Sequence, residues 1–268
     1  MSSAYKFFNK ISRLTSLEYK AVHRTKIFGI LWKFLNPLLF IAVYTFVFST
    51  LYTGGSRGFI ISMGILLFSG ISTSINSSTS WIQPKILNYS YSVKKINLIF
   101  MSKIYFNFIP IFYLIPVMVL IQRLLFNVDF KFTIFESIEI FLQTILLTFF
   151  TMIYCFILCI PISILSKHLT DVKDLVSHLL RIILYLSPIL WIAKTDIDLI
   201  NYLLQLLNPF YFIFESLNFI IYRSYDVSIL SFATLSILVI FTYIRFIRNK
   251  KYVTDIKRLA YRWIKKSW

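Results

Sequence analysis

The sequence predicts an all-α protein that crosses a membrane several times. Its 268 residues are 58% hydrophobic and only 15% charged, whereas soluble domains contain about 25% charged residues. A soluble chain of this length could not bury so much apolar surface in one core. A helix needs roughly 20 apolar residues to cross the hydrocarbon layer. Six stretches meet that requirement: Phe34–Tyr52, Gly58–Ile82, Ile104–Gln122, Ile140–Ser166, Leu175–Ala193 and Val227–Ile244.

The segment before the first span, residues 1–33, is predicted to be a cytoplasmic amphipathic helix on the membrane surface. Phe7, Phe8 and Ile11 share one helical face, while Lys6 and Lys10 lie on the other, a pattern typical of interfacial helices. The segment has no uninterrupted apolar run, so we expect no secretory signal peptide. Residues 34–244 then form the six-span membrane domain, and residues 245–268 form a basic cytoplasmic tail.

Three prolines indicate where helices begin or break. Asn36-Pro37 reads as an N-cap followed by a first-turn proline, which predicts that the first span begins there. Pro188 lies inside the fifth stretch, where it should kink or break the helix. The shorter apolar piece Leu199–Phe214 contains Asn208-Pro209 and predicts a re-entrant hairpin, with a short helix running from that pair through Glu215. Broken backbone at membrane depth requires protein or a water-filled cavity around it.

The charges orient the chain and account for its net charge of +17. With the N-terminus inside, 23 of the 28 Lys and Arg residues fall on the cytoplasmic side. The positive-inside rule therefore places both termini in the cytoplasm. It also explains the positive net charge, so we expect no nucleic-acid partner.

The energy source is expected to be a separate polypeptide. Five of the six spans contain no ionisable Asp, Glu, Lys, Arg or His, which disfavours a proton- or ion-coupled carrier. No Gly is followed by Lys, so a phosphate-binding loop of the Walker type is absent and the chain itself should hold no cofactor. Cys155 and Cys159 are expected to be buried thiols without a metal.

One charged cluster raises the possibility of an enzyme. It consists of Lys167, His168, Asp171, Asp174, His178 and Arg181. The last four follow helical spacing on one face. This pattern favours a charged cytoplasmic end of the fifth span, able to contact a partner, over a catalytic site.

Aromatic and hydroxyl residues suggest a transport path but leave alternatives open. Phe40, Tyr44, Phe48 and Tyr52 recur every four residues on the first span. Sugar rings stack on aromatic faces, so this ladder either lines a glycan path or packs against other helices. Tyr185 and Trp191, near Pro188, are similar candidates. The second span is rich in Ser and Thr from Ser69 to Ser80, which suits either helix packing or a hydrated wall.

The segment Leu17–Ser49 contains Glu18-x-Lys20, Gly29-x-Leu31-Trp32, Pro37 and Tyr44-x-x-Val47-Phe48. This pattern resembles the start of type-2 ABC-transporter permeases, nearest to those that export bacterial capsule, O-antigen (lipopolysaccharide) or teichoic-acid polymers. Later segments agree in order. They are Leu87-Asn88-Tyr89 with Val93–Asn97 after the second span, Ser187-Pro188-Ile189, and Asn208-Pro209 followed by Glu215. The family often has Arg three residues after that Glu; here the residue is Asn218, and Arg223 is an alternative partner.

The resemblance implies a homodimer in the bacterial cytoplasmic membrane, with two ATPase subunits that bind ATP and Mg. It implies export of a lipid-linked glycan, with a drug or lipid permease as the alternative within the class and a glycan-modifying membrane enzyme outside it. The expected substrate-path residues are Phe40, Tyr44, Phe48, Tyr52, Tyr185, Pro188, Trp191, Asn208 and Glu215. ATPase docking is expected at the connections Pro84–Asn97 and Ser166–Asp174, through Pro84, Lys85, Asn88, Lys94, Lys95, Lys167, Asp171 and Asp174.

Overall fold

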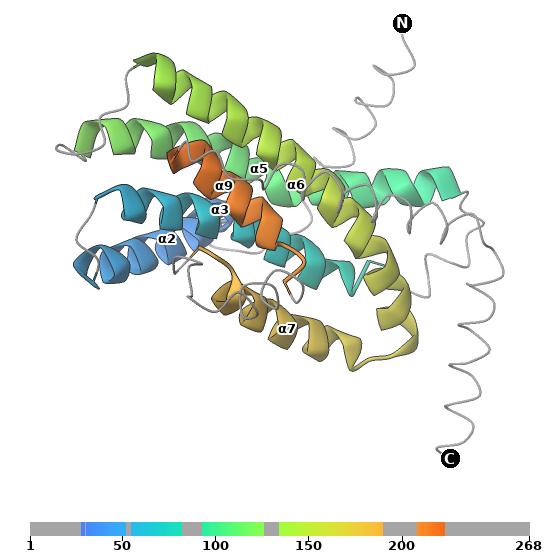
Figure 1. Ribbon diagram of the computed structural model, residues 1–268. Coiled ribbons are helices and arrows are strands. Elements are labelled where there is room, and N and C mark those ends of the chain that lie inside the picture. Colours follow the sequence, from blue (N-terminus) through green and yellow to red (C-terminus); the bar gives the residue numbers. More distant parts are fainter. Residues whose placement is uncertain are drawn as a thin grey trace, which may run out of the picture.

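The computed structural model describes residues 28–29, 31–51, 55–81, 93–125, 134–189 and 208–222. These residues form α-helices and no strand (Figure 1). The helices are α2 (Leu31–Leu51), α3 (Gly55–Ser78), α5 (Val93–Leu125), α6 (Ile134–His168), α7 (Val172–Leu186) and α9 (Tyr211–Tyr222). The predicted N-terminal surface helix, the sixth span Val227–Ile244 and the basic tail lie outside the described residues, apart from the last few positions of the N-terminal segment.

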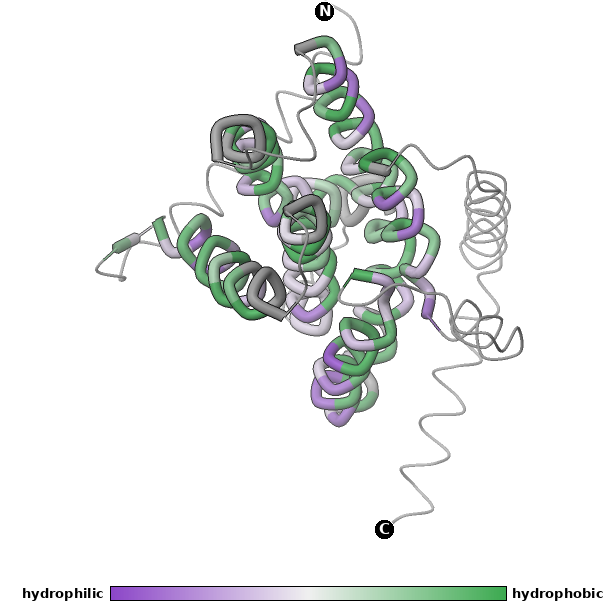
Figure 2. The backbone as a smooth tube through the Cα atoms, turned by 60° about the vertical axis from the view of Figure 1, so that its left-hand side comes forward, coloured by the Kyte–Doolittle hydropathy of each residue, from purple (hydrophilic) through white to green (hydrophobic). Residues whose placement is uncertain are grey.

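Three of the described helices are long and apolar enough to cross a membrane. The apolar segments are Gly58–Ser78 of α3, Leu98–Leu120 of α5 and Phe135–Ser163 of α6, which coincide with the second, third and fourth predicted stretches. Figure 2 shows apolar residues along most of the described helices. The helices α5 and α6 have 33 and 35 residues, so each is about 50 Å long. They therefore extend beyond a hydrocarbon layer of roughly 30 Å.

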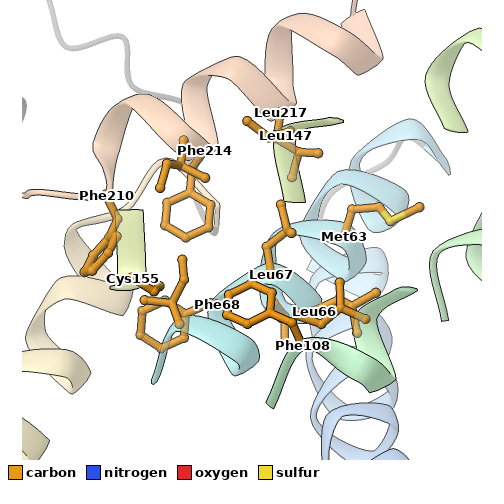
Figure 3. Packing of buried hydrophobic residues seen from close by; sticks show 14 of the residues in the cluster. Met63, Leu66, Leu67, Phe68, Phe108, Leu147, Cys155, Phe210, Phe214 and Leu217 are labelled. Atoms are coloured by element: carbon orange, nitrogen blue, oxygen red, sulfur yellow. The ribbon is translucent and has the colours of Figure 1, made fainter. Parts of the chain in front are cut away.

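Helix α3 is the centre of the bundle. It packs against α2, α5, α6, α7 and α9, and 83% of its apolar segment is buried, against 44% for α5 and for α6. Close approach depends on glycine, because a Cβ at Gly64 would lie 2.6 Å from Ile189 Cγ2. In Figure 3, Phe214 and Leu217 of α9 lie over Phe68 and Leu67 of α3.

The outer surface of α6 carries an exposed apolar stripe, in contrast to the buried surface of α3. Its members recur at helical spacing: Phe135, Ile138, Leu142, Leu146, Phe149 and Ile153. A stripe of large apolar side chains along one face of a long helix is what contact with lipid tails requires. The bundle thus combines a packed interior around α3 with an apolar exterior.

The first helix begins earlier than the sequence predicted. α2 starts at Leu31, so Asn36 and Pro37 lie inside it, and the prediction that this pair starts the first span is wrong. The start is set instead by a turn in which Gly29 has φ 48°, a conformation that favours glycine. The Leu31 N–H donates to the Phe28 carbonyl at 2.9 Å. The helix accommodates Pro37 by giving up one backbone hydrogen bond.

The breaks predicted near the fifth span are confirmed. α7 ends at Leu186, and Ser187 is extended, with φ −85° and ψ 142°, directly before Pro188. The short helix after Asn208-Pro209 is α9, which passes through Glu215 and ends at Tyr222. Residues 199–207 lie outside the described residues, so the re-entrant hairpin stays a prediction.

A polar seam joins the end of α3 to α6. The Ser163 hydroxyl lies 2.7 Å from the Ser78 carbonyl and 2.6 Å from the Cys159 carbonyl of its own helix. The Ser166 hydroxyl donates to the Thr79 carbonyl at 2.8 Å. The last carbonyls of a helix lack intrahelical partners, so α6 supplies donors to them. We call Ser74, Ser78, Thr79, Cys159, Ser163 and Ser166 the α3–α6 seam. Cys155 and Cys159 are free and buried, as predicted.

Candidate functional site

A cavity of about 520 Å³ lies between α2, α3, α5 and α7. Its lining combines polar and aromatic side chains with a few aliphatic ones. The lining residues are Lys33, Asn36, Pro37, Phe40, Tyr44, Ile65, Phe68, Ser69, Ser72, Thr73, Asn76, Asn107, Pro110, Ser177, Leu180, Arg181, Leu184 and Tyr185.

Each long wall of the cavity is one face of one helix. On α3 the wall consists of Ser69, Ser72, Thr73 and Asn76, whose spacing of three and four residues places them on a single face. Ile65 and Phe68 continue the same face. Similar spacing joins the lining residues of α2, from Lys33 to Tyr44, and of α7, from Ser177 to Tyr185. The hydroxyl-rich second span thus faces the cavity with one side only.

The cavity has a polar end and an aromatic end. Asn107, near the middle of α5, donates to the Ser77 hydroxyl near the end of α3 at 3.2 Å, so the end of α3 lies beside the middle of α5. The turn between α6 and α7 lies at the same end, because Ser166 bonds to Thr79. The polar end therefore contains Lys33, Asn36, Asn76, Asn107, Ser177 and Arg181. The aromatic end contains Phe40, Tyr44, Phe68 and Tyr185.

The hydroxyl groups of α3 present acceptors to the cavity. Ser69 donates to the Leu66 carbonyl at 2.7 Å, and Thr73 donates to the Ser69 carbonyl at 2.6 Å. A hydroxyl has one donor hydrogen and two lone pairs, so a hydroxyl that donates to its own helix still offers an acceptor. This wall is therefore suited to accept hydrogen bonds from the O–H groups of a ligand.

Two tyrosines connect α2 with α7 at the aromatic end. The Tyr44 and Tyr185 side chains share a hydrogen bond. Phe40 is 58% exposed and Tyr185 is 63% exposed, so their ring surfaces are available to a ligand. The two helices meet here across the cavity while both pack against α3.

Among the described residues that line the cavity, two are cations and none is Asp or Glu. The Lys33 ammonium donates to the Phe106 carbonyl and lies over the Phe106 ring, which holds it at the contact between α2 and α5. Arg181 is exposed on α7, on the same side as Asp174 and His178. The polar end is therefore positively charged by its own lining residues.

The structure brings together three of the nine residues predicted for the substrate path. Phe40, Tyr44 and Tyr185 line the cavity, whereas Tyr52, Trp191 and the side chain of Phe48 lie outside the described residues. Pro188, Asn208 and Glu215 are not among the lining residues.

Pro188 and Asn208 belong to a hydrogen-bonded junction instead. The Asn208 amide donates to the Ser187 hydroxyl at 2.8 Å, and Ser187 donates to the Ile183 carbonyl at 2.6 Å. Asn218, at the position where the resembling family often has Arg, donates to the Pro188 carbonyl at 3.1 Å. Protein groups therefore satisfy the broken backbone, one of the two environments that such a break can have.

The predicted docking residues are described only in part. Pro84, Lys85 and Asn88 lie outside the described residues, as do the side chains of Lys94, Lys95 and Lys167. The backbone of Lys94 and Lys95 lies in the first turn of α5. Asp171 and Asp174 are exposed, and a turn of three residues replaces the longer connection expected between α6 and α7.

The ends of the two connections lie at the same end of the bundle. Trp81, which follows α3, packs edge-to-face against Phe100 of α5 with ring centroids 5.1 Å apart. The Lys103 ammonium lies 5.8 Å from the Trp81 ring centroid. Together with the contact between Ser166 and Thr79, these contacts bring the residues flanking both connections close to one another.

No protein-family model matches this chain, and no curated protein matches it significantly. The interpretation of the cavity therefore depends on its own residues and on the sequence pattern.

The lining residues that were not predicted for the path include Lys33, Asn36, Asn107 and Arg181. Lys33 belongs to the segment predicted to be cytoplasmic, Asn36 is predicted to cap the first span, and Arg181 belongs to the charged cluster at the end of the fifth span. Asn107 carried a usable signal, because an amide inside an apolar span requires a partner or water. The convergence of four helices on one cavity has no such local signal.

Proposed function

We propose that the chain is the membrane-spanning permease subunit of an ATP-driven ABC exporter that moves a lipid-linked polysaccharide outward. The observation that carries the proposal is the composition of the cavity. Its α3 wall offers hydroxyl acceptors, and its α2 and α7 walls offer exposed aromatic rings. A sugar has O–H donors around its ring and apolar C–H faces, so it can use both kinds of wall.

The proposed topology has six spans, a re-entrant hairpin between the fifth and sixth, and both termini in the cytoplasm of a bacterial cell. The helices α3, α5 and α6 support three of the spans, and the distribution of basic residues supports the orientation. In this orientation the polar end of the cavity lies toward the cytoplasm and the aromatic end lies toward the outer side.

The proposed assembly is a homodimer with two ATPase subunits that supply ATP hydrolysis. Support for docking comes from the end of the bundle where Trp81, the start of α5 and the turn between α6 and α7 meet. Asp171 and Asp174 are exposed there. A partner that contacts both connections at once could transmit its movement to α3 and α7, which are walls of the cavity.

The alternatives find less support in the cavity. A permease for an apolar drug or lipid would not require the row of hydroxyl and amide groups on α3. A glycan-modifying enzyme would require a nucleophile with a base, or a pair of carboxylates. Among the described residues, the lining has no His, Cys, Asp or Glu, so it offers no pair of carboxylates, no histidine base and no cysteine nucleophile.

The proposal is tested by deleting the gene for this chain in its own strain and measuring surface glycan and intracellular lipid-linked glycan. We expect surface glycan to fall and the lipid-linked form to accumulate inside. Complementation with the F40L/Y44L variant should restore assembly but little export. The matched control is Phe46→Leu, because Phe46 lies on the same helix, is 70% exposed and does not line the cavity. Unchanged surface glycan after deletion would refute the proposal.

A further inference from the structure

A proline interrupts the hydrogen bonding of α5 close to the start of α2. Pro110 lies inside α5 and has no N–H group, so it cannot donate to the carbonyl four residues before it. That carbonyl belongs to Phe106, which is only 5% exposed. A buried carbonyl without a donor costs free energy, and the hydrocarbon layer contains no water to supply one. The Phe106 carbonyl therefore requires a donor from another part of the chain.

The first turn of α2 supplies that donor. The Lys33 ammonium donates to the Phe106 carbonyl and lies over the Phe106 ring. The long, flexible stem of a lysine lets its ammonium reach from one helix to the next. The next residue makes a second contact, because the Phe34 ring packs edge-on against the Tyr113 ring of α5 with centroids 6.2 Å apart. Two neighbouring residues of α2 thus contact α5 on both sides of Pro110.

The two halves of α5 have different neighbours. Before the proline, Phe100 contacts Trp81, and the Lys103 ammonium lies near the same ring, at the end of the bundle proposed for ATPase docking. After the proline, Phe112 contacts Phe149 of α6 with ring centroids 5.1 Å apart. A helix bends most readily at a proline. The angle between the two halves therefore depends on the contacts that bridge the proline.

We propose that Lys33 and Phe34 bridge the proline break of α5 and couple its docking half to the α2 wall of the cavity. Lys33 replaces the donor that Pro110 lacks, and Phe34 holds the half beyond it. Both are positioning residues, because a movement of the docking half carries the start of α2 with it, and Asn36 and Phe40 of the same helix line the cavity. The bridge itself stands on these contacts, whereas its role in transport rests on the proposed function.

The replacement of the missing donor is tested by a double-mutant cycle on the purified full-length chain. K33M keeps most of the side-chain length but removes the charged donor, so it should lower the melting temperature by about 3 °C. P110A restores the missing N–H group to α5. In the P110A background, K33M should therefore lower the melting temperature by less than about 1 °C. K33R keeps a donor and should melt within about 1 °C of the wild type.

P116A provides the matched control background. Pro116 lies in the same helix and deprives a different carbonyl, that of Phe112, of its donor. K33M should therefore still lower the melting temperature by about 3 °C in P116A. An equal effect of K33M in the wild-type, P110A and P116A backgrounds would overturn Lys33 as the replacement donor.

The bend of α5 is measured separately, so that the bridge can be decided even if P110A does not fold. Spin labels at Tyr105 and Leu120, which are both exposed, lie on either side of Pro110 and about 22 Å apart along the helix. The distribution of distances between the labels should be at least about twofold broader in K33M/F34A than in the chain with both residues intact. An unchanged width would overturn the bridge.

The labelled chains need a common background and a control. The two native cysteines of the chain are replaced in all of them by C155A and C159A, so that the labels attach only at the chosen positions. K173M is the matched control, because Lys173 is an exposed cation of α7 and does not line the cavity. It should leave the width unchanged, and equal broadening in K173M would contradict a specific role of the α2 residues.

The role in transport is tested by surface glycan per molecule of assembled chain in the complemented deletion strain. K33M should export at least about fivefold less than the wild type, and Phe46→Leu is again the control. Normal export by an assembled K33M chain would overturn the coupling. Normal surface glycan in the deletion strain itself would refute the proposed function instead, and the double-mutant cycle on the purified chain would still decide the bridge.

Discussion

The two polar faces of α3 carry the same kinds of residue and do different things. On the face toward α6, Ser74 and Ser78 are buried, and their carbonyls accept from Cys159 and Ser163. On the face toward α2 and α7, the neighbouring Thr73 is exposed and lines the cavity. The difference lies in the facing helix, because α6 offers donors at short range while α2 and α7 leave a gap. Hydroxyl content alone therefore does not distinguish a packed helix from a transport path.

The largest expected loss of stability comes from a larger side chain at the close contact between α3 and Ile189. A Cβ at Gly64 would lie 2.6 Å from Ile189 Cγ2, close to the junction that follows α7. The substitution Gly64→Leu should therefore displace Ile189 and destabilise the bundle by about 3 kcal/mol. The measurement is the yield and melting temperature of the purified chain. Gly64→Ala should show a smaller loss in the same direction, and wild-type stability of the Leu variant would contradict the packing described for α3.

A smaller effect should follow from removing the donors of the α3–α6 seam. The double variant S163A/S166A leaves the Ser78 and Thr79 carbonyls without their bonds from α6. The expected loss is about 1 kcal/mol, because hydrogen bonds between membrane helices have modest net energies. The matched control is S72A/S177A, which removes two hydroxyls from the cavity lining. The free energy of unfolding of that variant should stay within about 0.5 kcal/mol of the wild-type value. Equal losses of stability in the two double variants would contradict the difference between the α6-facing and the cavity-facing sides of α3.

The smallest effect on stability is expected at the aromatic end. Tyr44→Phe removes the hydrogen bond to Tyr185 but keeps the ring. Stability should change by less than about 1 kcal/mol, whereas the contact between α2 and α7 should loosen. A cross-link between cysteines placed at Tyr44 and Tyr185 reports on that contact, and it is made with a bismaleimide because two tyrosine side chains that meet at their hydroxyl ends hold the backbones farther apart than a disulfide can span. The prediction is efficient cross-linking of this pair by the reagent in the resting protein, and no cross-link would contradict the meeting of α2 and α7.

Much of the fold could be predicted from the sequence because apolar length is a local property. The spans within α3, α5 and α6 and the break before Pro188 follow from composition and from the chemistry of proline. The residue at which α2 starts was predicted less accurately than these spans. The Asn36-Pro37 pair carries a valid capping signal, but the turn at Gly29 begins the helix earlier, and the helix then continues through the proline.

The site was predictable only where a helical repeat was visible. A spacing of four residues identified Phe40 and Tyr44 on one face of α2, and both line the cavity. Helical spacing applied to α3 could also have assigned Thr73 and Asn76 to the face that lines the cavity, and Ser74 and Ser78 to the buried face. The amide of Asn107 inside an apolar span could have been recognised, whereas the addition of Lys33 and Arg181 could not be predicted, because it depends on how four helices meet in space.

The most direct test of the two faces uses adjacent residues. In an otherwise native chain, Thr73→Cys places a thiol in the cavity, and Ser74→Cys places one in the α3–α6 seam, where Ser74 is 0% exposed. Cys155 and Cys159 are also 0% exposed, so they should contribute little background. In inside-out vesicles, a water-soluble thiol reagent should label the Thr73→Cys variant at least about tenfold faster than the Ser74→Cys variant. Equal labelling rates at the two positions would contradict a hydrated cavity on one face of α3 and a packed seam on the other.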